Sequence, residues 1–234
     1  MTCKVERRYL LIPVDEYSLK KKLYFTEDGV KVRVLEARIS ARADHFMPYD
    51  MREFLSRTLE ITTQPECDYI PVFSDEPYTG KPYAEKYRPS AHFTARSGWI
   101  NDPNGLILYE GRYHLFYQHN PVDTIWGNMH WGHAVSEDLV HWEELEEALF
   151  PDENGAMFSG SAIADTQNLT GLKCNEHDPL LLFYTAAGGA YELSDKQSTQ
   201  RLAYSTDGGK TFVKYPRAMI ETVTPENRDP KVIF

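Results

Sequence analysis

The sequence predicts an all-β protein whose second part is built from repeated four-stranded units. Short apolar or alternating runs, typical of strands, recur along the chain between turn signals. One unit also recurs as sequence, because residues 134–138 followed by Trp142 reappear as residues 203–207 followed by Phe212. Repeated four-stranded units indicate β-propeller blades.

The first 64 residues are expected to form a small antiparallel β domain, sandwich-like in arrangement. Glu27-Asp28-Gly29 is a hairpin turn signal between the second and third apolar runs. The runs predicted as strands are Tyr9–Val14, Leu23–Phe25, Val30–Ile39, His45–Tyr49 and Thr58–Thr62.

Residues 65–90 hold five of the 14 prolines, with four tyrosines between them. Proline excludes a central strand or a helix here, so this segment is predicted to be a linker or a strap over a surface. The tyrosines favour the strap, since they offer apolar faces for packing.

Residues 91–234 are expected to be the N-terminal part of a propeller. The first predicted set of strands is 106–109, 113–118, 131–136 and 142–145, and the second is 159–165, 180–186, 201–205 and 212–215. A third restart at 228–234 resembles residues 101–103 and the apolar strand after them. Two blades and a fraction cannot close a propeller, which needs at least four, so we expect a fragment.

Composition excludes several function classes. The net charge is −10 and no basic stripe is visible, which argues against a nucleic-acid partner. Tyr9–Val14 is too short for a signal peptide core or a membrane span, so we expect no membrane partner and a cytoplasmic protein, or an extracellular one if a leader was removed. The three cysteines have no metal-ligand spacing, and oligomeric state is not predicted.

The segment Asn101-Asp102-Pro103-Asn104-Gly105 is the centre of the candidate site. Pro103 favours an extended Asp102, and Asn104-Gly105 is typical of a tight turn before a strand. This pattern holds a carboxylate at the entrance of a strand, although the same residues also suit a plain turn.

Propeller geometry predicts which residues meet Asp102. The innermost strands of all blades line one channel, so Asp102, the pair Phe158-Ser159 and Asp229 are expected to converge at one rim. Arg228 beside Asp229 is expected to keep that carboxylate ionised. Two carboxylates and an arginine are suited to a sugar pocket.

Six segments in order resemble glycoside hydrolase family 32, the invertases, levanases and inulinases. They are 99–105 (WINDPNG), 116–121 (FYQHNP), 126–128 (WGN), 130–134 (HWGHA), 158–162 (FSGSA) and 228–230 (RDP). The resemblance implies a five-bladed β-propeller followed by a β-sandwich, and a β-fructosidase that needs no cofactor. The small β domain before the propeller resembles levanase-like members, which favours fructan over sucrose.

The resemblance also implies roles for individual residues. Asp102 matches the nucleophile and Asp229 the transition-state stabiliser. The positions that match the fructosyl pocket are Asn101, Gln118, Trp126, Phe158, Ser159 and Arg228. These residue types suit a retaining glycosidase. In such an enzyme one carboxylate attacks the anomeric carbon and a second carboxyl group protonates the leaving oxygen.

The general acid is not found in this chain. In the family it is a Glu in a Glu-Cys box after the Arg-Asp-Pro box, whereas Glu66-Cys67 precedes the propeller. Loss of general acid catalysis typically costs about 10²–10⁴-fold, so the 234 residues alone are expected to be inert.

Other interpretations remain open. His130 and His133 lie on opposite faces of a predicted strand, so we expect structural roles and no metal site. The leading hypothesis is hydrolysis of β-linked fructose from fructans or sucrose. A non-catalytic fructoside-binding propeller is the alternative, ahead of a protein-binding propeller, and fructosyl transfer is also compatible with the motifs.

Overall fold

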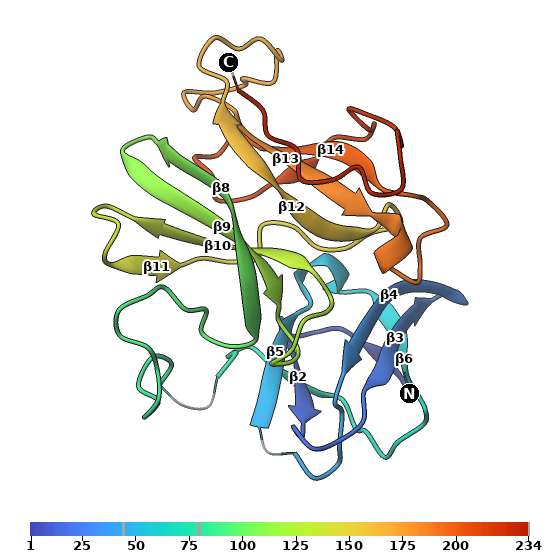
Figure 1. The fold of residues 1–234 in the computed structure, drawn as a ribbon. Coiled ribbons are helices and arrows are strands. Elements are labelled where there is room, and N and C mark those ends of the chain that lie inside the picture. The colour runs from blue at the N-terminus through green and yellow to red at the C-terminus, as the bar shows by residue number, and fades with distance from the viewer. Residues whose placement is uncertain (44, 79–80, 234) are drawn as a thin grey trace. The chain divides into compact units, whose positions relative to one another are not determined.

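The computed structural model describes residues 1–43, 45–78 and 81–233 and confirms the predicted all-β class. Its strands form four antiparallel sheets (Figure 1). Two single-turn 3₁₀ helices, Arg52–Phe54 and Gly188–Ala190, interrupt them. Within these ranges no helix has the length and apolar character needed to cross a membrane.

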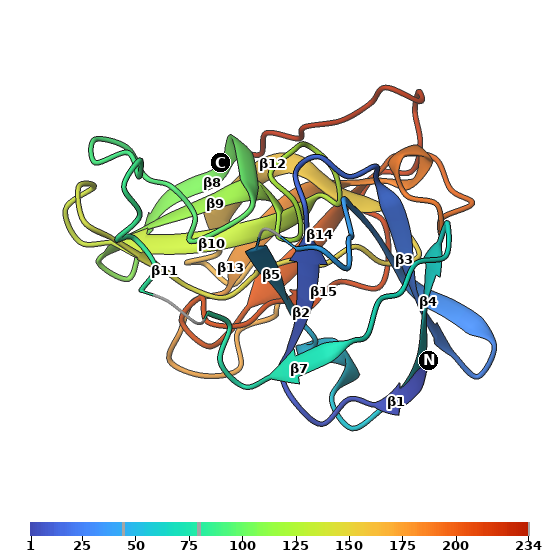
Figure 2. The ribbon, with the colours of Figure 1, turned by 90° about the horizontal axis from the view of Figure 1, so that it is seen from below.

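The chain divides into two compact units, the first made of residues 1–99 and 120–128 and the second of residues 100–119 and those from 129 onward. The first unit holds two sheets, with strand orders β1-β6-β3-β4 and β5-β2-β7 (Figure 2). The strands are β1 (Thr2–Lys4), β2 (Tyr9–Val14), β3 (Lys21–Glu27), β4 (Val30–Ala37), β5 (His45–Asp50), β6 (Thr58–Gln64) and β7 (Val72–Ser74).

The expected hairpin joins β3 to β4. Glu27 pairs with Val30, and both Asp28 and Gly29 between them have positive φ, of 47° and 80°. Two left-handed residues in a two-residue loop match the twist of the flanking strands. The apolar side chains of both sheets, among them Leu10, Phe25 and Leu59, meet in one buried core.

The described residues of the proline-rich segment contribute one short strand. β7 pairs with β2 at the edge of its sheet, where proline neighbours do not interrupt a central ladder. The predicted boundaries of 1–64, 65–90 and 91–234 remain predictions.

Residues 120–128 belong to the first unit although they connect two strands of the second. Val122 lies fully buried in the first unit's core. The Asn128 side chain accepts from the backbone N–H of Glu36 and donates to its carbonyl, both at 2.8 Å. Glu36 lies on β4, the edge strand of its sheet, so this amide pairs with backbone groups that an edge leaves open.

The second unit contains two four-stranded meanders, β8-β9-β10-β11 and β12-β13-β14-β15. The first runs from green to yellow in Figure 1. The strands are β8 (Trp99–Tyr109), β9 (Arg112–Asn120), β10 (His130–Ser136), β11 (Trp142–Glu144), β12 (Ala156–Ala164), β13 (Leu180–Ala187), β14 (Thr199–Ser205) and β15 (Val213–Lys214). The core holds Phe116, Trp131 and Tyr184, all fully buried.

One predicted turn is wrong. β8 runs through Asn101-Asp102-Pro103-Asn104-Gly105 without a break, so these residues are part of a strand and not its entrance. Gly105 has a φ of 53°, and a Cβ there would lie 2.8 Å from the Phe116 ring. Glycine suits this position for two reasons. It adopts a positive φ without strain, and it has no Cβ to clash with the ring.

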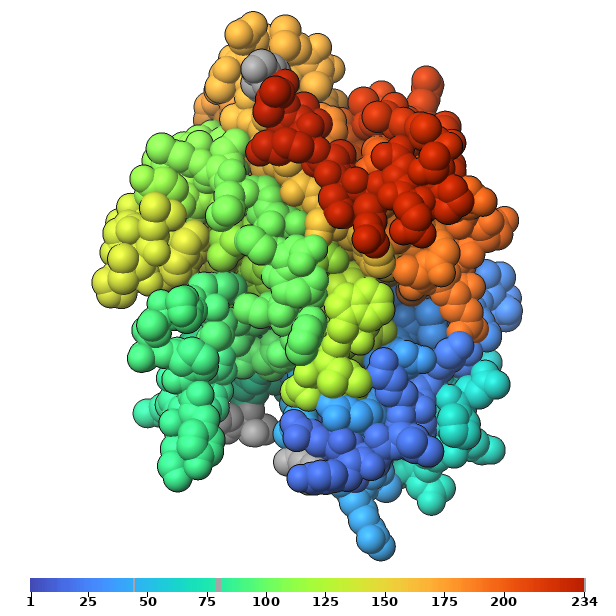
Figure 3. All heavy atoms as spheres, in the orientation of Figure 1, coloured from blue at the N-terminus to red at the C-terminus, as the bar shows by residue number. Residues whose placement is uncertain are grey.

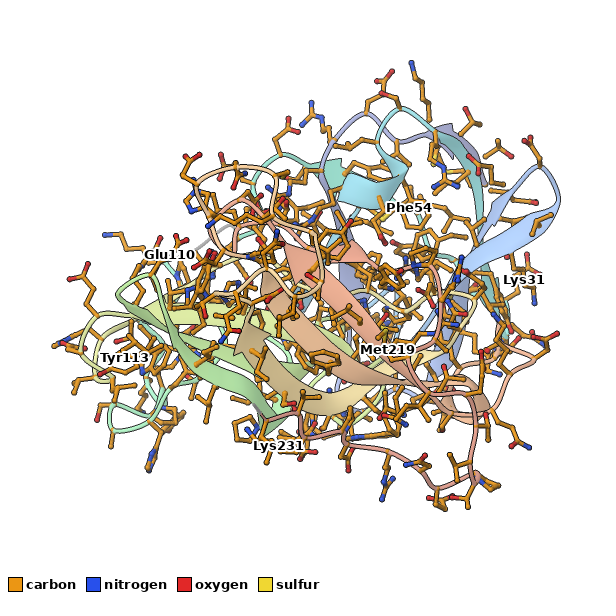
Figure 4. All side chains as sticks on the ribbon, turned by 90° about the horizontal axis from the view of Figure 1, so that it is seen from above. Lys31, Phe54, Glu110, Tyr113, Met219 and Lys231 are labelled. Carbon is orange, nitrogen blue, oxygen red and sulfur yellow. The ribbon has the colours of Figure 1, made fainter. Side chains whose placement is uncertain are left out.

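The strand predicted at 228–234 is also not formed over the described residues 228–233, and Phe234 lies outside them. Ser161 Oγ donates to the Pro230 carbonyl at 2.9 Å and accepts from the Val232 N–H at 3.1 Å. A side chain of β12 therefore supplies the partners that a neighbouring strand would supply. Figure 3 shows the red C-terminal part of the chain lying over orange atoms of the same unit, and Figure 4 labels Lys231 on the segment 228–233.

Candidate functional site

Asp102 presents an exposed carboxylate from β8. The Ser159 hydroxyl of β12 donates to Asp102 Oδ2 at 2.8 Å, and Asn101 Nδ2 donates to Oδ1 at 3.3 Å. The Ser159 hydrogen bond, followed by those of Asn101 and the backbone and by the charge of Arg228, lowers the pKa of Asp102 against a weaker opposing effect of burial. This carboxylate is therefore ionised at neutral pH.

A β-bulge aims Ser159 at Asp102. Phe158 pairs with Thr185 and Gly160 with Tyr184, which leaves Ser159 as the extra residue on β12. Gly160 is required beside the bulge, since a Cβ there would lie 1.9 Å from the Phe183 carbonyl oxygen.

A second contact joins β12 to β8 beside the bulge. The Gly160 N–H donates to Asn104 Oδ1 at 3.3 Å, and Asn104 is itself buried. The bulge and this contact hold the two strands together around the carboxylate.

Asp229 lies on the C-terminal segment with a left-handed φ of 60°. Arg228 Nε lies 3.7 Å from Asp229 Oδ2, and both side chains are half exposed. Removal from water raises the pKa of Asp229, Arg228 opposes this and the Asp102 charge adds to it.

Arg228 acts on Asp229 in the predicted direction, since its charge lowers the pKa of this carboxyl, but the net pKa is still raised. The arginine lowers this pKa by less than burial and Asp102 together raise it. The two carboxyl groups interact with each other, and their pKa values are displaced in opposite directions.

Phe158 and Arg228 border a cavity of about 330 Å³, within the range of small-molecule sites. The remaining lining residues are Ala187, Gly189, Ala190, Gln197, Ser198, Pro225 and Glu226. The cavity combines a phenyl ring with a guanidinium and a carboxylate, which are groups that can contact sugar faces and hydroxyls.

The pocket roles predicted for Gln118 and Trp126 stay predictions. Gln118 is 2% exposed, and its Nε2 donates to the Met157 carbonyl at 2.8 Å. Trp126 is 52% exposed and lies on the segment 120–128 of the first unit. The structure thus groups Asn101, Asp102, Phe158, Ser159, Arg228 and Asp229 from the predicted set.

Asn104, Gly160 and Thr185 were not among the predicted site residues. Gly160 between two serines in a strand is a signal for a bulge, so this feature was detectable. Nothing in the local sequence marks Thr185, because its role depends on a partner from the distant C-terminal segment.

Across residues 1–43, 45–78 and 81–233, no group of three or more His, Cys, Asp or Glu side chains is arranged to hold a metal ion. Two of the histidines instead contact each other. His114 Nδ1 and His133 Nε2 lie 2.9 Å apart, both buried. Burial lowers the pKa of His114 to about 4 and also lowers that of His133, so the pair is neutral.

Comparison with known proteins gives a consistent result. Residues 92–234 match the model of the glycosyl hydrolases family 32 N-terminal domain. The chain is 44% identical to a levanase of Bacillus subtilis (strain 168) over 165 residues, which are 70% of this chain and 24% of the levanase. It is also 44% identical to an invertase of Schizosaccharomyces pombe, covering 63% of this chain and 26% of the invertase.

The structure is similar to that of a β-fructofuranosidase from Schwanniomyces occidentalis solved with fructosyl-erythritol. The TM-score is 0.56 at 40% identity, over 62% of this chain and 29% of that one. This likeness confirms the predicted β-propeller class for the second part of the chain. The chain spans about a quarter of the length of these relatives.

Proposed function

The chain belongs to glycosyl hydrolase family 32, and on that basis we propose that the protein releases β-linked fructose from levan-type or inulin-type fructans, or from sucrose. The observation that carries this proposal is the pair of interacting carboxyl groups of Asp102 and Asp229, with their pKa values displaced in opposite directions. Carboxyl groups held in unlike environments are typical of glycosidase sites, where each performs a different task.

In the proposed mechanism an oxygen of the ionised Asp102 attacks the anomeric carbon. The bond to the leaving oxygen breaks, that oxygen takes a proton from a general acid, and a fructosyl ester of Asp102 forms. Water then attacks the ester, gives a proton to the same acid-base group and releases fructose with retained configuration.

Asp229 and Arg228 bind the ring rather than react. A fixed carboxylate binds sugar hydroxyls more tightly as the ring flattens, which is binding specific to the transition state. Arg228 opposes protonation of both carboxylates and keeps them available for these contacts.

The general acid is proposed to lie in a segment that these 234 residues do not include. The family motifs found here contain the proposed nucleophile and stabiliser but not the acid, so we expect no turnover from these residues alone. In the same proposal, β8–β11 and β12–β15 are two of five blades, and the sheets of β1–β7 form an accessory domain.

The test uses the protein as its own cell produces it, assayed for fructose release from levan, inulin and sucrose. Asp102→Asn is expected to abolish release, because the amide cannot form the ester. Glu137→Gln, at an exposed carboxylate in the turn after β10, serves as the control and keeps full activity.

Appreciable release by Asp102→Asn would overturn the mechanism. Calorimetric binding of a fructoside by a wild type that releases no fructose would instead support the non-catalytic sugar-binding alternative.

A further inference from the structure

A buried polar pair lies behind Asp229, between two strands of the second sheet of the propeller unit. Thr185 of β13 stands directly opposite Gln200 of β14 in the antiparallel register. Thr185 is 0% exposed and Gln200 5% exposed. Polar side chains this deeply buried need hydrogen-bond partners, and the identity of those partners shows what the pair holds.

The partners link the sheet to the backbone around Asp229. The Thr185 hydroxyl donates to Gln200 Oε1 at 2.8 Å and accepts from the Asp229 N–H at 2.9 Å. Gln200 Nε2 donates to the Asn227 carbonyl at 2.7 Å. The backbone is therefore anchored on both sides of Arg228, by two side chains that are themselves joined.

This anchor substitutes for regular secondary structure. Asp229 is in no strand and has a left-handed φ of 60°, a conformation that costs every L residue free energy, although less for Asn and Asp than for the others. Such a conformation persists only where the surroundings hold it in place. Ser161 holds the residues that follow, at Pro230 and Val232.

We propose that Thr185 and Gln200 are positioning residues, which set the orientation of Asp229 and Arg228 toward the sugar held at Asp102. This inference rests on the proposed function, in which Asp229 binds the transition state. Because a displacement of about 1 Å in such a group can cost about 10²-fold in rate, loosening this anchor lowers catalysis without removing any group that touches substrate.

The decisive variant is Thr185→Val in the full-length protein. Valine keeps the shape of threonine, but its methyl group leaves the Asp229 N–H and Gln200 Oε1 without their shared partner. We expect kcat to fall about 10–100-fold with KM within about twofold, because the lost interaction acts mainly in the transition state. Thr185→Ser restores the hydroxyl and is expected to recover most of kcat.

Thr199→Val is the matched control. Thr199 is 4% exposed on β14, and its hydroxyl accepts from Arg201 Nε at 3.2 Å, outside the anchor. The same substitution there is expected to change thermal stability about as much as Thr185→Val while kcat stays at the wild-type value.

A second readout does not depend on activity. Hydrogen exchange at the Asp229 amide is expected to accelerate in Thr185→Val, to return toward wild type in Thr185→Ser, and to stay unchanged in Thr199→Val. Wild-type kcat in Thr185→Val, or an equal loss in Thr199→Val, would overturn the positioning role. Absence of fructose release by the wild type would refute the proposed function instead.

Discussion

At the scale of single residues, the Ser159 hydroxyl donates a hydrogen bond to the carboxylate of Asp102. Its hydrogen bond at 2.8 Å is the largest influence that lowers the pKa of this carboxyl. The hydroxyl reaches Asp102 only because the bulge in β12 turns Ser159 out of the pairing. A one-residue bulge in β12 thus lowers the pKa of a carboxyl group on β8.

We expect Ser159→Ala to raise the pKa of Asp102, since the ionised form loses its principal donor. Because the nucleophile must be ionised, the acid limb of kcat/KM against pH moves to higher pH, and activity at low pH falls first. Ser205→Ala is the control, since that hydroxyl also bonds an aspartate, Asp207, but in a turn after β14. An unmoved acid limb in Ser159→Ala contradicts this assignment.

At the scale of elements, the segment 120–128 is held by the first unit through a buried ion pair. Arg38 bonds the carboxylate of Asp123 through its guanidinium and, at 3.0 Å, through its backbone N–H. Asp123 is fully buried and Arg38 is 14% exposed. The connection between β9 and β10 therefore depends on side chains that lie outside the matched family domain.

Arg38→Ala is expected to lower the free energy of unfolding by about 3–5 kcal/mol, because it leaves a buried carboxylate without its partner. Arg57→Ala, which breaks the more exposed pair with Glu27, is the control and is expected to cost much less. Urea unfolding of both variants measures the difference. Equal losses of unfolding free energy in the two variants would contradict the larger cost expected for the buried Asp123.

At the scale of the whole molecule, the neutral pair of His114 and His133 makes stability depend on pH. Burial lowers both pKa values, that of His114 to about 4, whereas an unfolded histidine titrates near about 6.5. Below that value the unfolded state binds more protons than the folded state, so stability is complete above about pH 6.5 and declines as pH falls toward about 4.

Tm is therefore expected to decrease as the pH is lowered from 7.5 to 5. Carboxylates with lowered pKa values titrate below this window and do not contribute to the change. His114→Gln removes one titrating group and is expected to flatten this dependence. His141→Asn, at a side chain 88% exposed, should leave the slope of the wild type. A wild-type Tm that is constant across the window would contradict the neutral pair.

The sequence alone determined most of the strands, the repeat and the candidate carboxylates of this protein. Tyr9–Val14 coincides with β2, because alternation and turn residues act locally and leave a visible pattern. Asp102 and Asp229 stood out because each lies in a short motif beside proline.

The tertiary structure decided how these parts act on one another. The uninterrupted β8, the bulge at Ser159, the anchor of Thr185 and Gln200, and the raised pKa of Asp229 all depend on partners distant in sequence. Hydrogen bonding and burial between distant segments leave no periodic trace in the sequence, so only the folded chain shows which carboxyl group loses its proton more readily.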